Sequence, residues 1–141
     1  MKNPEFRWLR MDAHTLAVHY CLCLDVETFD AELKRLGIRE RPNMLKSGTS
    51  NATVHFLTHA DGKTHCAIVC LPKWDKFTPA QIAGLLVHEA SHIFDKHCDI
   101  IGEYEPSSEF KAYALQLITQ ELMLSFLQQS MPPKKVKKRG K

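Results

Sequence analysis

Five consecutive residues, His88-Glu89-Ala90-Ser91-His92, carry the side chains best suited to chemistry in this chain. In a helix, residues four apart lie about 6 Å apart along the axis and about 40° apart around it, so both imidazoles project from one face. Imidazoles placed in this way can share one Zn²⁺. Glu89 lies about 100° further round than His88, where a carboxylate can reach a water on the metal and act as general base. The pattern predicts a metal site with an adjacent base.

A catalytic zinc needs a third protein ligand and one position left open. His97 is five residues beyond His92, which turns it about 140° away from the metal face. The remaining candidates downstream are acidic: Glu103, Glu105 and Glu109. Glu109 opens the next predicted helix, and an antiparallel neighbour can bring its first turn back toward the pair. We therefore favour Glu109 as the third ligand, with Glu105 as the main competitor. If Glu109 is not a ligand, its negative charge would simply stabilise the N-terminus of its helix.

The elements that must position these residues fit one domain. The chain has 141 residues, of which 44% are hydrophobic and 25% charged, as in ordinary globular proteins. An apolar pattern of period two predicts a strand over residues 14–24. Asp25 can cap a helix that runs to about residue 36, and polar residues with Pro42 and Gly48 predict a loop over 39–51.

A hairpin and two long helices are predicted in the second half. The β-favouring runs 52–59 and 64–71 flank Asp61-Gly62, a pair typical of a type I′ turn, in a register in which Thr58 faces His65. Thr78-Pro79 predicts the start of the helix that carries the two histidines, and a further helix is expected over 107–129. This order of elements predicts an α+β fold with helices on one face of a small antiparallel sheet.

An HExxH helix followed by a glutamate ligand on the next helix is similar to the gluzincin class of zinc metallopeptidases. More narrowly, three segments resemble small phage- and prophage-encoded metallopeptidases: Leu-Leu-Val-His-Glu-Ala-Ser-His at 85–92, Ile-Gly-Glu at 101–103 and Glu-Phe-Lys-Ala-Tyr-Ala at 109–114. The resemblance is strongest over residues 52–129. It implies a minimal zincin-like domain that cleaves a peptide or protein substrate, with Zn²⁺ on His88, His92 and Glu109 and with Glu89 as base.

Tyr113 stands at a position where this chain departs from the class. Many gluzincins place an aspartate four residues after the glutamate ligand, and here that residue is Tyr113. Because it shares a helix face with Glu109, its hydroxyl can support the metal shell or donate to a developing oxyanion. The alternative is a tyrosine of the core whose hydroxyl has a hydrogen-bond partner.

Basic charge is concentrated at the end of the chain. The net charge is +3, from 19 basic and 16 acidic side chains, but six of the basic ones lie within residues 134–141. The remaining residues carry 13 basic and 16 acidic groups, a net charge of −3. We therefore expect a single domain over 1–131 and a disordered basic tail over 132–141. Such a tail either contacts nucleic acid or keeps the protein soluble.

Two rival functions follow from these features. In the first, the protein is a nucleic-acid-associated or phage assembly factor with a non-catalytic zinc. Coordination of the metal by four protein ligands, with Glu105 or Cys98 added to the set, would favour this alternative. In the second, it is a metalloprotease resembling the ImmA/IrrE group, which cleaves one regulator protein.

The cysteines and the N-terminus bear on the compartment. The chain has five cysteines, and their spacing matches neither a zinc ribbon nor a CxxC motif. We expect them to be buried as small hydrophobic residues, with free thiols in a reducing compartment. No secretory signal and no run of 18 apolar residues is present, so we expect a cytoplasmic protein without a membrane span, in the host cytoplasm if it is phage-encoded. The sequence leaves its oligomeric state open.

Overall fold

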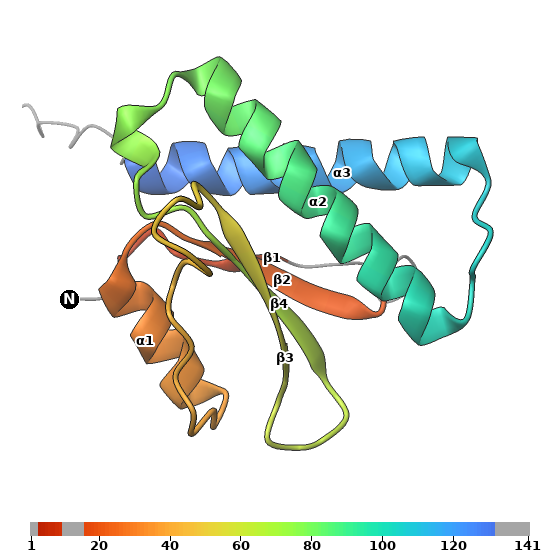
Figure 1. Ribbon diagram of the computed structural model, residues 1–141, viewed down its shortest axis with the longest axis horizontal. Coiled ribbons are helices and arrows are strands. Elements are labelled where there is room, and N and C mark those ends of the chain that lie inside the picture. The colour runs from red at the N-terminus through yellow and green to blue at the C-terminus, as the bar shows by residue number, and fades with distance from the viewer. Residues whose placement is uncertain (1–2, 10–15, 132–141) are drawn as a thin grey trace, which may run out of the picture.

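The computed structural model describes residues 3–9 and 16–131, and the predicted basic tail lies outside them. The chain is α+β, as predicted (Figure 1). Its elements in chain order are β1 (Trp8–Leu9), β2 (Val18–Cys23), α1 (Val26–Arg35), β3 (Thr53–Thr58), β4 (His65–Cys70), the short 3-10 helix η1 (Trp74–Lys76), α2 (Pro79–Ile101) and α3 (Ser108–Ser130).

The four strands form one mixed sheet in the order β1-β2-β4-β3. β2 and β4 pair in parallel, from Val18 opposite His65 to Cys23 opposite Cys70, while the two outer pairs are antiparallel. The prediction of an antiparallel sheet was therefore wrong. Strand-forming patterns reveal where strands lie but not how they pair. Here α1 and the loop after it carry the chain past the position beside β2 to the outer strand β3, and the hairpin then places β4 between β2 and β3, parallel to β2.

Helices cover both faces of the sheet. Tyr20 and Leu22 of β2 belong to the hydrophobic core shared with α2 and α3, whereas Cys21 and Cys23 pack with Phe29 of α1 on the other face. The expectation that helices cover one face only was wrong, because strands with almost continuous burial require cover on both sides. All five cysteines are buried with free thiols, in agreement with their predicted role.

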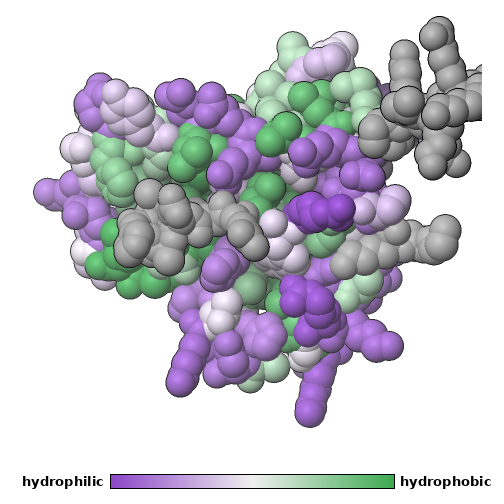
Figure 2. All heavy atoms as spheres, turned by 180° about the vertical axis from the view of Figure 1, so that it is seen from behind, coloured by the Kyte–Doolittle hydropathy of each residue, from purple (hydrophilic) through white to green (hydrophobic). Residues whose placement is uncertain are grey.

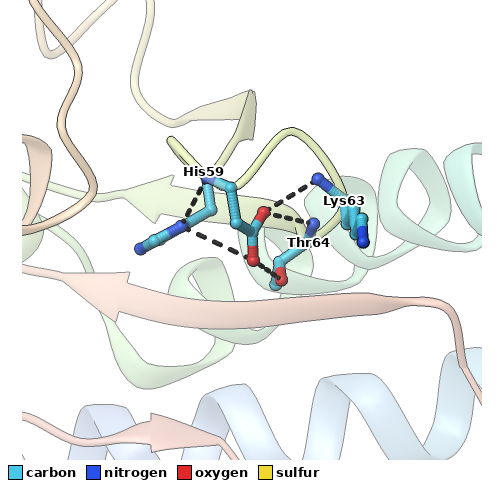
Figure 3. A network of polar contacts seen from close by, with 4 residues as sticks. His59, Lys63 and Thr64 are labelled. Carbon is cyan, nitrogen blue, oxygen red and sulfur yellow. Dashed lines mark hydrogen bonds and ion pairs between the residues drawn. The ribbon is translucent and has the colours of Figure 1, made fainter.

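The hairpin has the predicted register and a different turn. Thr58 lies opposite His65, as the sequence indicated. Only the glycine of the Asp61-Gly62 pair has positive φ, 71°, so the turn is not of type I′, which needs positive φ at both residues. The Asp61 carboxylate instead accepts hydrogen bonds from the Thr64 hydroxyl at 2.7 Å and from the backbone N–H groups of Lys63 and Thr64 (Figure 3). These hydrogen bonds lower the pKa of Asp61 to about 2, and the bond from the Thr64 hydroxyl has the largest effect.

The two long helices begin where the sequence predicts. Thr78 and Gln81 form a capping box in which each side chain accepts a hydrogen bond from the other residue's backbone N–H, with Pro79 at the first helical position. Gly102 ends α2 in the left-handed conformation at φ 73°, and Ser107 caps α3. α2 crosses α3 in front of it in Figure 1. Within the described residues, no helix is long and apolar enough to cross a membrane.

Candidate metal centre

The two histidines of the motif converge in the middle of α2. Their Nε2 atoms lie 3.2 Å apart and their ring planes make an angle of 79°. Both side chains are exposed. Two nitrogen ligands at 2.0–2.1 Å from one tetrahedral Zn²⁺ are about 3.3 Å apart, so His88 and His92 suit two adjacent coordination positions. The same separation suits an N–H···N hydrogen bond between two neutral rings of opposite tautomers.

Glu89 is buried beside this pair. Its exposed fraction is 5%, and its carboxylate accepts a hydrogen bond from the backbone N–H of Val54 in β3. Burial raises the pKa of Glu89, and the positive charges of protonated His88 and His92 and of Lys46 oppose that rise. A carboxyl whose pKa is raised toward neutrality is a stronger base than an exposed one and is suited to proton transfer at physiological pH.

The side of α2 that carries the histidines borders β3. Lys96, one turn beyond His92, places its Nζ 6.0 Å from the ring centre of Phe56 in β3. The opposite side of α2 meets α3, where Phe94 packs edge-on against Phe110 at a centroid distance of 5.4 Å. These contacts fix the rotation of α2 about its axis and leave the imidazole pair on the side that faces away from α3.

Glu109 and Tyr113 therefore do not join the histidines. Glu109 is exposed in the first turn of α3, and Tyr113 is 68% exposed one turn later. Within the described residues, no group of three or more His, Cys, Asp or Glu side chains is placed so that it could hold a metal ion. The donor set in the structure thus matches two zinc ligands, and the third ligand, Glu109 or Glu105, stays a prediction.

Strand β3 and the loop before it supply site groups that the sequence analysis missed. β3 is an edge strand, and the N–H of Val54 points away from β4 toward Glu89. Because hydrogen-bonding groups alternate along a strand, the backbone of Phe56 and Thr58 faces the same way. A backbone donor leaves no trace in residue type, so the sequence could not single out the N–H of Val54.

Comparisons with known proteins add no relative to this picture. The chain matches no family model, no curated protein and no solved structure at the threshold of significance.

Proposed function

We propose that the protein is a zinc-dependent peptide hydrolase in which His88 and His92 bind the metal and Glu89 is the general base. The observation that carries this proposal is the 3.2 Å approach of the two Nε2 atoms beside a buried carboxylate. A bound zinc supplies a water of lowered pKa and polarises the carbonyl under attack. Glu89 accepts the proton of the water and returns it to the leaving amine, for which its raised pKa is suited.

The edge of β3 is the proposed place for the substrate. An extended peptide can pair with the outward-facing backbone of Phe56 and Thr58, as in strand addition. β3 borders the side of α2 that carries the imidazoles, as the contact of Lys96 with Phe56 indicates. Main-chain pairing at this edge would present a peptide carbonyl near the histidines with little selection by side chains. The proposed substrate class is therefore an extended segment of a peptide or protein in the cytoplasm.

For the third ligand, Glu109 remains the proposed residue and Glu105 its competitor. Either carboxylate would have to be carried round α2 by a movement of the connection at residues 102–107 or of the first turn of α3. Competition for zinc with a chromogenic chelator distinguishes them. The variant Glu109→Gln should weaken zinc binding about tenfold or more, while Glu105→Gln should leave it unchanged; the reverse result would assign Glu105.

The central test separates metal binding from proton transfer. Zinc content is measured by mass spectrometry, and cleavage of denatured protein or of a peptide library by analysis of the products. We expect wild type to bind one zinc, His88→Ala to lose it, and Glu89→Gln to retain it with at least a hundredfold loss of turnover. Asp99→Asn, an exposed acid on the same helix, serves as the matched control.

Each other outcome contradicts a defined part of the proposal. A wild-type protein without zinc would remove the metal site. Undiminished cleavage by Glu89→Gln would remove the base. Bound zinc without cleavage of any peptide would favour the rival in which the metal is non-catalytic, in a nucleic-acid-associated or phage assembly protein. Cleavage of one folded regulator alone would favour the rival that resembles the ImmA/IrrE group.

A further inference from the structure

The solvent-facing side of α3 carries large hydrophobic side chains in a regular pattern. Six of them are between 40% and 68% exposed, and the least exposed, Phe110, also packs against Phe94 of α2. Together with Gln120 they are separated alternately by three and four residues, the spacing of a coiled-coil seam. We call this set the outer stripe: Phe110, Tyr113, Leu117, Gln120, Leu124, Leu127 and Met131.

The outer stripe lacks the charges of a solvated helix face. From Ala112 to Met131 the only charged residue in the sequence is Glu121. Its carboxylate accepts a hydrogen bond from the hydroxyl of the buried Tyr20, so it belongs to the packing of α3 on the sheet. Green hydrophobic side chains reach the surface between purple polar ones in the upper part of Figure 2, at the level of α3 in Figure 1. Large exposed apolar patches on globular proteins mark interaction sites.

The spacing of the outer stripe is complementary to a second copy of itself in the opposite direction. With two α3 helices antiparallel and centred on Gln120, Leu117 of each faces Leu124 of the other. The aromatic residues Phe110 and Tyr113 then lie opposite Met131 and Leu127. The stripe spans about 32 Å of helix, so every apolar position meets an apolar position along its whole length.

Two hollows in the surface are lined in part by Leu127 and Met131, the residues that would lie opposite the partner's Tyr113 and Phe110. One has a volume of about 310 Å³ and is lined mainly by apolar side chains, Trp74, Phe126, Leu127 and Met131 among them. Another, of about 580 Å³, is lined by Glu5, Arg7, Leu127, Gln128 and Met131. Aromatic side chains that fill pockets of a partner contribute a large share of interface energy.

Charge at the two ends of α3 favours the same direction. The connection before α3 and the start of the helix carry three exposed acidic residues, Glu103, Glu105 and Glu109, against one exposed lysine, Lys111. The sequence after α3 carries six basic residues at 134–141. Acidic residues thus precede α3 in the sequence and basic residues follow it, an order of charges that favours antiparallel over parallel pairing of two copies.

From these observations we infer that α3 forms the interface of a homodimer, in which the outer stripes of two copies pack antiparallel about Gln120. A polar residue within such a seam sets register, and Gln120 is placed to do so. The interface assigns Tyr113 to packing against the partner. The imidazole pair lies on the side of α2 that faces away from α3, so neither histidine belongs to this interface.

The oligomeric state of the full chain tests the interface. Sedimentation velocity at micromolar concentration should show a dimer for wild type and a monomer for Leu117→Lys/Leu124→Lys. Ala112→Lys, which adds a lysine on α3 outside the stripe, should remain a dimer. Circular dichroism establishes that each variant is folded. A monomeric wild type would overturn the proposal, also if another partner occupies the outer stripe. A dimer that survives the double substitution would overturn it as well.

Cross-linking tests the direction of the helices. The variants Leu117→Cys and Leu124→Cys are oxidised separately and as an equimolar mixture, with wild type as the control for the native thiols, all of which are buried. The antiparallel register predicts a disulfide-linked dimer in the mixture and little in either variant alone. Efficient cross-linking of each variant with itself would indicate parallel helices and overturn the proposed arrangement.

Discussion

At the scale of single residues, Glu89 connects stability with chemistry. It is a carboxyl with an exposed fraction of 5%, and the Val54 N–H is one of the groups that stabilise its charged form. Its burial raises its pKa, and the same burial makes the ionised form costly in the folded protein. A functional role for Glu89 would explain why a buried, costly carboxylate occupies this position on α2.

The dependence of stability on pH follows with a definite sign. Because the pKa of Glu89 is raised on folding, its favourable contribution is complete below the unfolded value, about 4.3, and is lost as pH rises through the folded value. We expect metal-free wild type to lose stability relative to Glu89→Gln as pH rises from about 4 toward neutrality. Urea unfolding with a chelator present measures this, with Asp99→Asn as control. A difference independent of pH would contradict the assignment.

At the scale of elements, the side chain of Gln129 links α3 to the sheet by a hydrogen bond. The Nε2 of Gln129 donates to the carbonyl of Leu22 in β2 at 2.9 Å and to the hydroxyl of Ser125 at 3.0 Å. β1 pairs only with Tyr20 and Cys21, so the carbonyl of Leu22 lies beyond the end of that pairing. The helix thus supplies the hydrogen bond that a longer β1 would have made.

Removing this link should destabilise the fold. Gln129→Ala leaves the buried carbonyl of Leu22 without its donor, which costs about 1–3 kcal/mol in the free energy of unfolding. Gln116→Ala, at an exposed position of the same helix, should change it by less than about 0.5 kcal/mol. Urea denaturation at one protein concentration measures both. Equal effects of the two substitutions would show that the bond from Gln129 to β2 contributes nothing.

At the scale of the whole molecule, charge and chemistry lie in different parts of the chain. The net charge of +3 depends on the six basic residues at 134–141, and the rest carries a net charge of −3. The candidate metal centre lies within α2 and next to β3, far along the sequence from the basic end. Net charge therefore bears on the proposed contacts of the C-terminal end, with nucleic acid or with a partner copy, and not on the proposed peptide hydrolysis.

Deleting residues 132–141 should separate these properties. We expect the shortened protein to keep the zinc stoichiometry of wild type, because the proposed ligands all precede residue 110. Its affinity for a DNA duplex at low salt should fall, since phosphate contacts depend on basic side chains. Zinc analysis and fluorescence anisotropy measure the two effects. Loss of zinc on truncation would show that the metal site and the C-terminal end are coupled.

What the sequence by itself determined is local. Helix capping sets the starts of α2 and α3 at Thr78 and Ser107 and the end of α2 at Gly102, and helix periodicity brings the two imidazoles together. Both effects involve residues within a turn or two of one another. The hairpin register is local in the same sense, while its turn type was mispredicted because Asp61 satisfies the loop through its side chain.

Only the tertiary structure decided how these pieces meet. Residues far apart in the chain determine the parallel pairing of β2 with β4 and the packing of α1 on the second face of the sheet. They also determine the burial of Glu89 against β3. The same holds for the rotation of α3, which buries Ile118 and Leu122 and leaves Glu109 away from the imidazole pair. A helical pattern with apolar residues on several faces does not state which face is covered, because that choice is made by the packing of the whole core.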